Sequence, residues 1–152
     1  MRGTDSFFDT NVLLYLLSGD AAKADHAEAV LARGGTISVQ VLNEFASVAA
    51  RKLGLSYPEI REVLELVRAV CTVEPITLET HDLGLQIAER YGFSLYDALI
   101  VAAALQARCR TLYSEDLQDG QPIDGRRVAR NPFAARPNDA GARDPNLGGT
   151  RT

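Results

Sequence analysis

Four acidic residues are the best candidates in this sequence for catalysis or metal binding. They are Asp9, Glu44, Asp97 and Asp116. Glu44 lies three residues after Val41 and four before Val48, so helical geometry turns its carboxylate toward an apolar face. Asp97 stands in the same relation to the apolar residues that follow it. A carboxylate in a low-dielectric surrounding must be protonated, paired or bound to a metal ion.

Convergence of these carboxylates would call for a cation. Two like charges about 4 Å apart repel by roughly 4 kcal/mol at an effective dielectric near 20, so either some acids are protonated or a metal ion holds them. Oxygen ligands without His or Cys favour Mg²⁺, with Mn²⁺ as a substitute, over zinc. The two histidines, His26 and His81, fall in helical segments away from the four acids. If the four acids converge on a metal ion, the residue types favour Mg²⁺ or Mn²⁺.

Each acid, taken alone, also has an ordinary structural interpretation. Asp9 precedes a helical pattern and suits an N-cap. Asp97 is the third residue after Ser94, as in a variant capping box. Asp116 and Asp119 fall in a turn-rich segment, where Asp is common. The functional interpretation therefore depends on the set of four.

Short strands alternate with helices along the chain, and these elements must position the acids. Strand-like runs cover residues 6–8, 36–39, 71–74 and 111–113. Helical patterns cover residues 12–17, 21–31, 40–53, 56–70, 77–91 and a segment that opens at residue 94. This alternation predicts an α/β fold with a short parallel sheet flanked by helices. Asp9 and residues 114–116 then lie at the carboxyl ends of strands, where such sheets carry their sites.

The length of 152 residues, of which 46% are apolar, predicts one domain with a self-sufficient core. We expect residues 1–133 to form this domain. Residues 134–152 are rich in Ala, Arg, Pro, Asn, Asp and Gly and offer almost nothing to bury. We therefore expect them to be a disordered tail.

Charge and cysteine content narrow the class of protein. The formal charge is −4, from 16 Lys and Arg against 20 Asp and Glu, which argues against an unspecific grip on nucleic acid through bulk positive charge. Cys71 and Cys109 have neither disulfide-framework nor zinc-site spacing, so we expect buried free thiols in a reducing compartment. Neither a secretory signal nor an apolar run long enough to cross a bilayer is evident, which predicts a cytoplasmic protein without membrane attachment.

Four segments between residues 7 and 120 form a set. They read FFDTNVLLY at 7–15, VLNEF at 41–45, YDALIVAAA at 96–104 and YSEDLQDG at 113–120. Together they resemble the signature segments of PIN-domain ribonucleases and, more narrowly, the VapC toxins of bacterial toxin–antitoxin pairs. The resemblance spans nearly the whole foldable chain and depends on the order and joint presence of the segments.

The resemblance implies a three-layer α/β/α PIN-like fold with one acidic pocket. Asp9 and Asp97 would be the most direct Mg²⁺ ligands, and Glu44 and Asp116 would complete one or two metal sites, partly through water. Three further residues match positions that support such a site by hydrogen bonding, namely Thr10, Asn11 and Ser114. Asp119 would be an accessory acid.

The resemblance also implies an activity and its partners. The chain would be a Mg²⁺-dependent endoribonuclease that hydrolyses RNA phosphodiester bonds, the toxin of a type II toxin–antitoxin system. It would form a homodimer and be inhibited by a cognate antitoxin protein. Four arginines are candidates for gripping RNA phosphates, although each is equally well explained as a solvated charge near a helix end: Arg51, Arg90, Arg108 and Arg110.

Three alternative protein classes compete with this interpretation. A phosphatase of the haloacid dehalogenase type needs Asp-x-Asp after its first strand, but Asn11 occupies the third position here. A response-regulator receiver domain needs a late lysine, and the lysines here are Lys23 and Lys52. A catalytically silent PIN-like binding module usually lacks one or more of the acids, whereas all four positions are filled. The silent module remains the main alternative.

Overall fold

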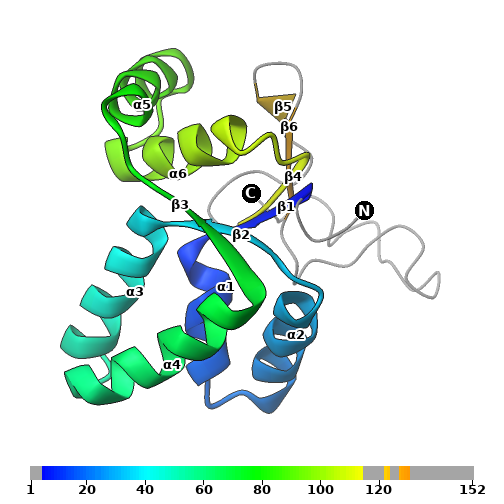
Figure 1. The fold of residues 1–152 in the computed structure, drawn as a ribbon, viewed down its shortest axis with the longest axis vertical. Coiled ribbons are helices and arrows are strands. Elements are labelled where there is room, and N and C mark those ends of the chain that lie inside the picture. The colour runs from blue at the N-terminus through cyan, green and yellow to red at the C-terminus, as the bar shows by residue number, and fades with distance from the viewer. Residues whose placement is uncertain (1–4, 115–121, 124–126, 131–152) are drawn as a thin grey trace, which may run out of the picture.

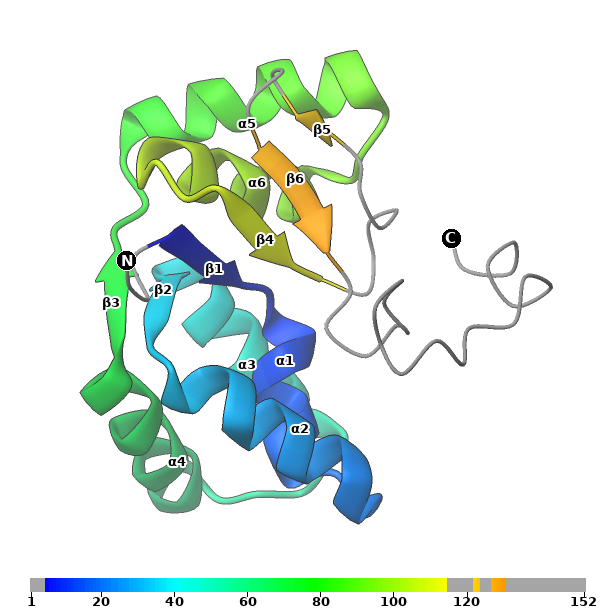
Figure 2. The ribbon, with the colours of Figure 1, turned by 90° about the vertical axis from the view of Figure 1, so that its right-hand side faces the viewer.

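The computed structural model describes residues 5–114, 122–123 and 127–130, which build a sheet with helices on both faces (Figures 1 and 2). The strand order is β3-β2-β1-β4-β6-β5. The strands are β1 (Ser6–Phe8), β2 (Gly35–Ser38), β3 (Cys71–Glu74), β4 (Thr111–Tyr113), β5 (Pro122–Ile123) and β6 (Arg127–Arg130). All neighbours pair in parallel except β5, which is antiparallel to β6. The predicted α/β fold with a short parallel sheet is confirmed.

The β5–β6 pair at the edge of the sheet was not predicted. Three residues, 124–126, connect the two strands, and so short a connection can join antiparallel but not parallel neighbours. Pro122 suits this place, because an edge strand has one row of N–H groups without a partner strand. The predicted tail, residues 134–152, lies outside the described residues.

The helices form two layers. They are α1 (Thr10–Leu14), α2 (Ala21–Ala32), α3 (Val39–Arg51), α4 (Tyr57–Val70), α5 (Leu78–Tyr91) and α6 (Leu95–Gln106). In Figures 1 and 2, α5 and α6 lie together on one side of the sheet and α1 to α4 on the other. The helix predicted to run through residue 17 is instead two pieces, since α1 tightens into a 3₁₀ turn, η2 (Tyr15–Leu17). The three-layer α/β/α arrangement is thus observed.

Local sequence signals set several helix ends. The predicted capping box opens α4: the Ser56 amide donates to Glu59 Oε1 at 2.8 Å, and the Glu59 amide donates to Ser56 Oγ at 3.2 Å. Gly92 ends α5 with a φ of 77°, a left-handed conformation that glycine adopts without a Cβ penalty. These contacts explain why the predicted and observed bounds of these helices agree closely.

Helix α6 forms the centre of the core. Every residue from Ala98 to Leu105 is buried, so the helix is covered all round. The cover comes from α5, which packs against α6, and from β2 and α3, which also contact it. On the sheet, Phe7 and Phe8 of β1 are almost completely buried. The central strand and this helix together anchor the elements that carry the acids.

Both cysteines are free and buried, as predicted. Burial raises the pKa of the Cys71 thiol from 9.0 to about 11, because the thiolate would lose its hydration. The thiol therefore stays protonated and poorly nucleophilic at neutral pH. In the described part of the chain, none of the helices has the length and apolar character needed to cross a bilayer.

Gly35 in β2 is a position where we expect even a methyl group to destabilise the protein. A Cβ there would lie 2.5 Å from Phe8 Cε2 and 2.8 Å from the Ser6 carbonyl oxygen, so β1 would have to move. Overpacking of this kind costs about 1–3 kcal/mol, and we expect Gly35→Ala to lower the free energy of unfolding by that amount. Urea denaturation measures it. Gly19→Ala is the control, since a Cβ at Gly19 meets no atom within 4 Å. Equal stability of the two variants would contradict the prediction.

Candidate active site

The order of the strands changes direction between β1 and β4. The chain passes from β1 outward to β2 and β3, then returns across the other face of the sheet to β4 on the opposite side of β1. In open α/β sheets, ligands bind at such a switch point, outside the carboxyl ends of the strands. Asp9 directly follows β1 and Ser114 directly follows β4. The Asp9 amide donates to the Tyr113 carbonyl at 2.9 Å, which ties the two strand ends together.

Asp9 is held by hydrogen bonds on both carboxylate oxygens. Its side chain is 5% exposed. Oδ1 accepts from the Thr10 amide at 2.6 Å, and Oδ2 accepts from the Ser114 hydroxyl at 2.6 Å. Asp9 is also the N-cap of α1, and capping the helix in this way does not conflict with a role in the site. Donors aimed at a carboxylate stabilise its ionised form and fix its orientation.

Glu44 reaches the same place from the second turn of α3. Its carboxylate is half-buried: Oε1 accepts from the Thr10 hydroxyl at 3.0 Å, and Oε2 accepts from Gln40 Nε2 at 2.9 Å. Thr10 therefore contacts both acids, Asp9 through its amide and Glu44 through its hydroxyl. The structure thus brings together Asp9, Thr10, Glu44 and Ser114 from three segments that are far apart in the sequence.

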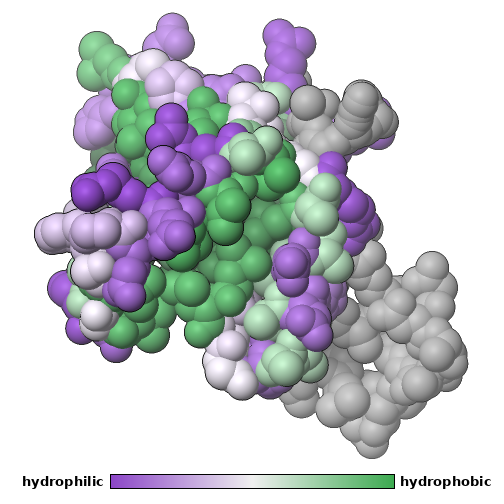
Figure 3. All heavy atoms as spheres, turned by 60° about the horizontal axis from the view of Figure 1, so that its bottom comes forward, coloured by the Kyte–Doolittle hydropathy of each residue, from purple (hydrophilic) through white to green (hydrophobic). Residues whose placement is uncertain are grey.

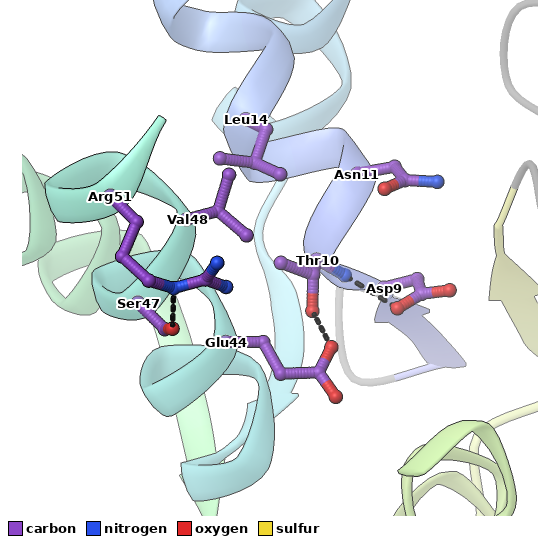
Figure 4. Close-up of a pocket in the computed structure, with 8 residues that line it drawn as sticks. All are labelled: Asp9, Thr10, Asn11, Leu14, Glu44, Ser47, Val48 and Arg51. Carbon is purple, nitrogen blue, oxygen red and sulfur yellow. Dashed lines mark hydrogen bonds between the residues drawn. The ribbon is translucent and has the colours of Figure 1, made fainter. Parts of the chain in front are cut away.

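These residues open onto a pocket of about 250 Å³ (Figure 4). It is lined by Asp9, Thr10, Asn11, Leu14, Glu44, Ser47, Val48 and Arg51. Figure 4 shows the two carboxylates on one side and Arg51 beside Ser47 on the other, with Leu14 and Val48 above them in this view. The predicted supporting residue Asn11 is among the lining residues. The pocket therefore combines an acidic end, an apolar wall and a cationic end.

The donor set at the acidic end fits a hard divalent cation. It contains carboxylate and hydroxyl oxygens from Asp9, Glu44, Thr10 and Ser114, and the amide side chains of Asn11 and Gln40 lie beside them. A carboxylate offers about four acceptor positions, so it can accept hydrogen bonds and bind an ion together. Mg²⁺ and Mn²⁺ prefer oxygen ligands of this kind.

Of the other two predicted acids, Asp97 and Asp116, only Asp97 falls within the described residues. Asp97 lies half-buried in the first turn of α6, where its amide donates to Ser94 Oγ at 3.2 Å, as the predicted cap requires. It is not among the pocket-lining residues. Within the described residues, no three His, Cys, Asp or Glu side chains lie close enough together to hold a metal ion. Asp116 and Asp119 fall outside the described part of the chain, so convergence of all four acids stays a prediction.

One contact of the site was missed from the sequence. Gln40 is buried and donates to Glu44 from one helical turn earlier. The spacing of four residues on a helix is the signal that could have found it, because side chains so spaced are neighbours. A buried Gln that orients a carboxylate is a supporting residue of the same kind as Thr10.

The fold is similar to those of chains in several solved toxin and toxin–antitoxin structures. A toxin–antitoxin complex from Klebsiella pneumoniae matches with a TM-score of 0.64 and 24% identity, over 86% of this chain and 99% of that chain. VapC20 of Mycobacterium tuberculosis, described as a toxin that cleaves the sarcin-ricin loop, matches with a TM-score of 0.60 and 20% identity, over 72% and 88% of the two chains. VapBC2 of Rickettsia felis, solved with a fragment of promoter DNA, matches with a TM-score of 0.60 and 16% identity, over 83% and 97%.

Sequence comparison gives the family directly. No curated protein matches the chain at the level of sequence. The family model described as the PIN domain matches residues 6–118, which include β1 to β4, all six α-helices and the pocket. The resemblance predicted from the four sequence segments is therefore confirmed, and this chain belongs to the PIN domain family.

Proposed function

We propose that this protein is a metal-dependent endoribonuclease that hydrolyses RNA phosphodiester bonds, and that it is the toxin of a type II toxin–antitoxin pair. The observation that carries the proposal is the pair of carboxylates, Asp9 and Glu44, joined through Thr10 at the switch point of a PIN-domain sheet. Asp9 is buried and Glu44 half-buried, and two carboxylates held side by side at a pocket favour a ligand of opposite charge.

The metal of the proposal is Mg²⁺, with Mn²⁺ as a substitute. Asp9 and Glu44 would hold it, and Asp97 and Asp116 would complete one or two sites. When bound, such an ion acidifies a water molecule and neutralises charge on a phosphodiester.

The protein's own residues do the positioning. The Ser114 hydroxyl and the Thr10 amide fix the Asp9 carboxylate, while the Thr10 hydroxyl and Gln40 fix Glu44. Asn11 supplies a further polar side chain at the pocket edge. Groups fixed in advance need no reorganisation when charge develops during the reaction.

The partner of the proposal is an antitoxin protein that covers apolar helix surface. Figure 3 shows apolar side chains gathered over the end of the molecule that faces down in Figure 1, where α1 to α4 lie. Leu53, Tyr57 and Leu66, around α3 and α4, are 48%, 68% and 71% exposed. The similar protein from Klebsiella pneumoniae is described as a toxin–antitoxin complex. A homodimer and a cytoplasmic location belong to the same proposal.

The test is cleavage of a panel of single-stranded and structured RNAs by the purified protein. A sarcin-ricin stem-loop belongs in the panel, because VapC20 is described as cleaving that loop. We expect cleavage with Mg²⁺ or Mn²⁺, none with EDTA, and a strong loss in the variant Asp97→Ala. If no RNA is cut by antitoxin-free protein, the catalytically silent binding module becomes the better proposal.

A further inference from the structure

Arg51 is the cationic side chain of the pocket that holds the two acids. It lies in the last turn of α3 and is exposed. Within the described residues it makes one polar contact, in which its Nε donates to Ser47 Oγ at 3.1 Å. A charge at a helix end can simply be solvated, so a binding role for Arg51 depends on where its guanidinium lies and which donors it offers.

The contact with Ser47 leaves the two terminal nitrogens of the guanidinium available as hydrogen-bond donors. An arginine has five N–H donors, and the bond from Nε uses one of them, so four remain on the two terminal nitrogens. Figure 4 shows these nitrogens on the pocket side of α3, with Ser47 behind them. A planar fork held in this way is arranged to donate two parallel hydrogen bonds to a phosphate.

Arg51 faces the same pocket as Glu44 from the same helix. It follows Glu44 by seven residues, about two helical turns along α3. Its bond to Ser47, four residues earlier, folds the side chain back toward Glu44. Leu14 and Val48 also line the pocket, and apolar side chains suit the faces of a sugar or a base. The pocket therefore offers a cation to the backbone of a strand that approaches the carboxylates.

The other candidate arginines lie elsewhere. The Arg90 guanidinium packs over the ring of Tyr91, at 5.5 Å from its centroid, and Arg108 and Arg110 are exposed beyond the end of α6. None of the three lines the pocket. Because the whole chain carries a charge of −4, attraction for RNA must come from cations placed locally.

We infer that Arg51 binds a backbone phosphate of the RNA strand in the pocket, and that Ser47 is its positioning residue. The inference rests on the proposed ribonuclease function. A contact to phosphate carries no base information, so Arg51 contributes affinity to every RNA sequence equally.

The test compares Arg51→Gln with Lys52→Gln. Both remove one positive charge, and Lys52 is the next residue, exposed and not part of the pocket lining. We expect Arg51→Gln to raise KM by about tenfold with kcat unchanged. The slope of log affinity against log salt should shrink by about 0.7 for single-stranded RNA. Lys52→Gln should match the wild type in both quantities.

A binding measurement separates this inference from the proposed function. Fluorescence anisotropy of a labelled single-stranded RNA, with Asp9→Asn as the background to prevent cleavage, should show the same loss of affinity and of salt slope. Arg51→Lys should keep the salt slope, and Ser47→Ala should weaken binding less than Arg51→Gln. If the wild type cleaves RNA and Arg51→Gln leaves KM and slope unchanged, the inference is overturned while the proposed function stands. Absence of cleavage by the wild type would contradict the proposed function itself.

Discussion

Replacement of Asp9 by Asn should lower metal-dependent RNA cleavage by about a thousandfold and leave the fold intact. The proposed ion supplies several kcal/mol of charge stabilisation in the transition state, and each 1.4 kcal/mol is a factor of ten in rate. The amide removes the negative charge that would hold this ion. Asn remains a good N-cap, so the hydrogen bond from the Thr10 amide can persist. The Ser114 hydroxyl can turn to accept from the new amide group.

Asp20→Asn is the matched control for this substitution. Asp20 is also the N-cap of a helix, α2, where it accepts from the amides of Ala22 and Lys23, but it is exposed and outside the pocket. We expect this variant to keep both cleavage and melting temperature. Initial cleavage rates with Mg²⁺ and thermal unfolding of both proteins decide the matter. Cleavage by Asp9→Asn at the wild-type rate would show that Asp9 does not serve catalysis.

Replacement of Phe45 by Ala should cost about 3–5 kcal/mol of unfolding free energy, the largest stability loss we predict. Phe45 is a residue of α3 that is fully buried in the core, and its truncation would leave a cavity there. Because domains of this size are stable by only about 5–15 kcal/mol, a large fraction of the total stability would be lost. Urea denaturation, analysed with a common slope for both proteins, measures the difference.

The substitution Glu44→Gln, at the neighbouring residue, should leave the stability nearly unchanged but lower RNA cleavage. Glu44 is half-buried at the pocket, and Gln keeps its shape and an oxygen that can accept from Thr10. We expect its unfolding free energy to stay within about 1 kcal/mol of the wild type, because both side-chain ends can still be hydrogen-bonded. Its RNA cleavage should fall strongly. If Phe45→Ala proved no less stable than Glu44→Gln, the assignment of Phe45 to the core and Glu44 to the site would be wrong.

Much of the fold follows from local signals that the sequence displays openly. The strands at residues 6–8, 71–74 and 111–113 are apolar or β-branched runs between clear breakers, and their predicted bounds match those observed. The capping box at Ser56 and Glu59 and the stop at Gly92 fixed helix ends in the same way. Such signals act within a few residues, which is why a single sequence reveals them.

Contacts between distant segments were harder to predict. The complete burial of α6 depends on how α5, β2 and α3 surround it, which no pattern within α6 specifies. The bond from Gln40 to Glu44 and the place of Arg51 in the pocket depend on side-chain rotamers at one face of α3. Four residues of the predicted site are joined by hydrogen bonds, namely Asp9, Thr10, Glu44 and Ser114. The position of Asp97 in the first turn of α6 explains its capping contact with Ser94 but does not by itself place its carboxylate beside Asp9.

The bond between Ser114 and Asp9 spans 105 residues of sequence, and this separation sets an order of events during synthesis on the ribosome. Asp9, Thr10 and Glu44 leave the ribosome early, within the first third of the chain. Strand β4 and Ser114 follow only after α5 and α6 have been made. A nascent chain therefore carries Asp9 through the synthesis of the next 105 residues without the hydroxyl that donates to its Oδ2. This link between the ends of β1 and β4 forms only after β4 itself has been made.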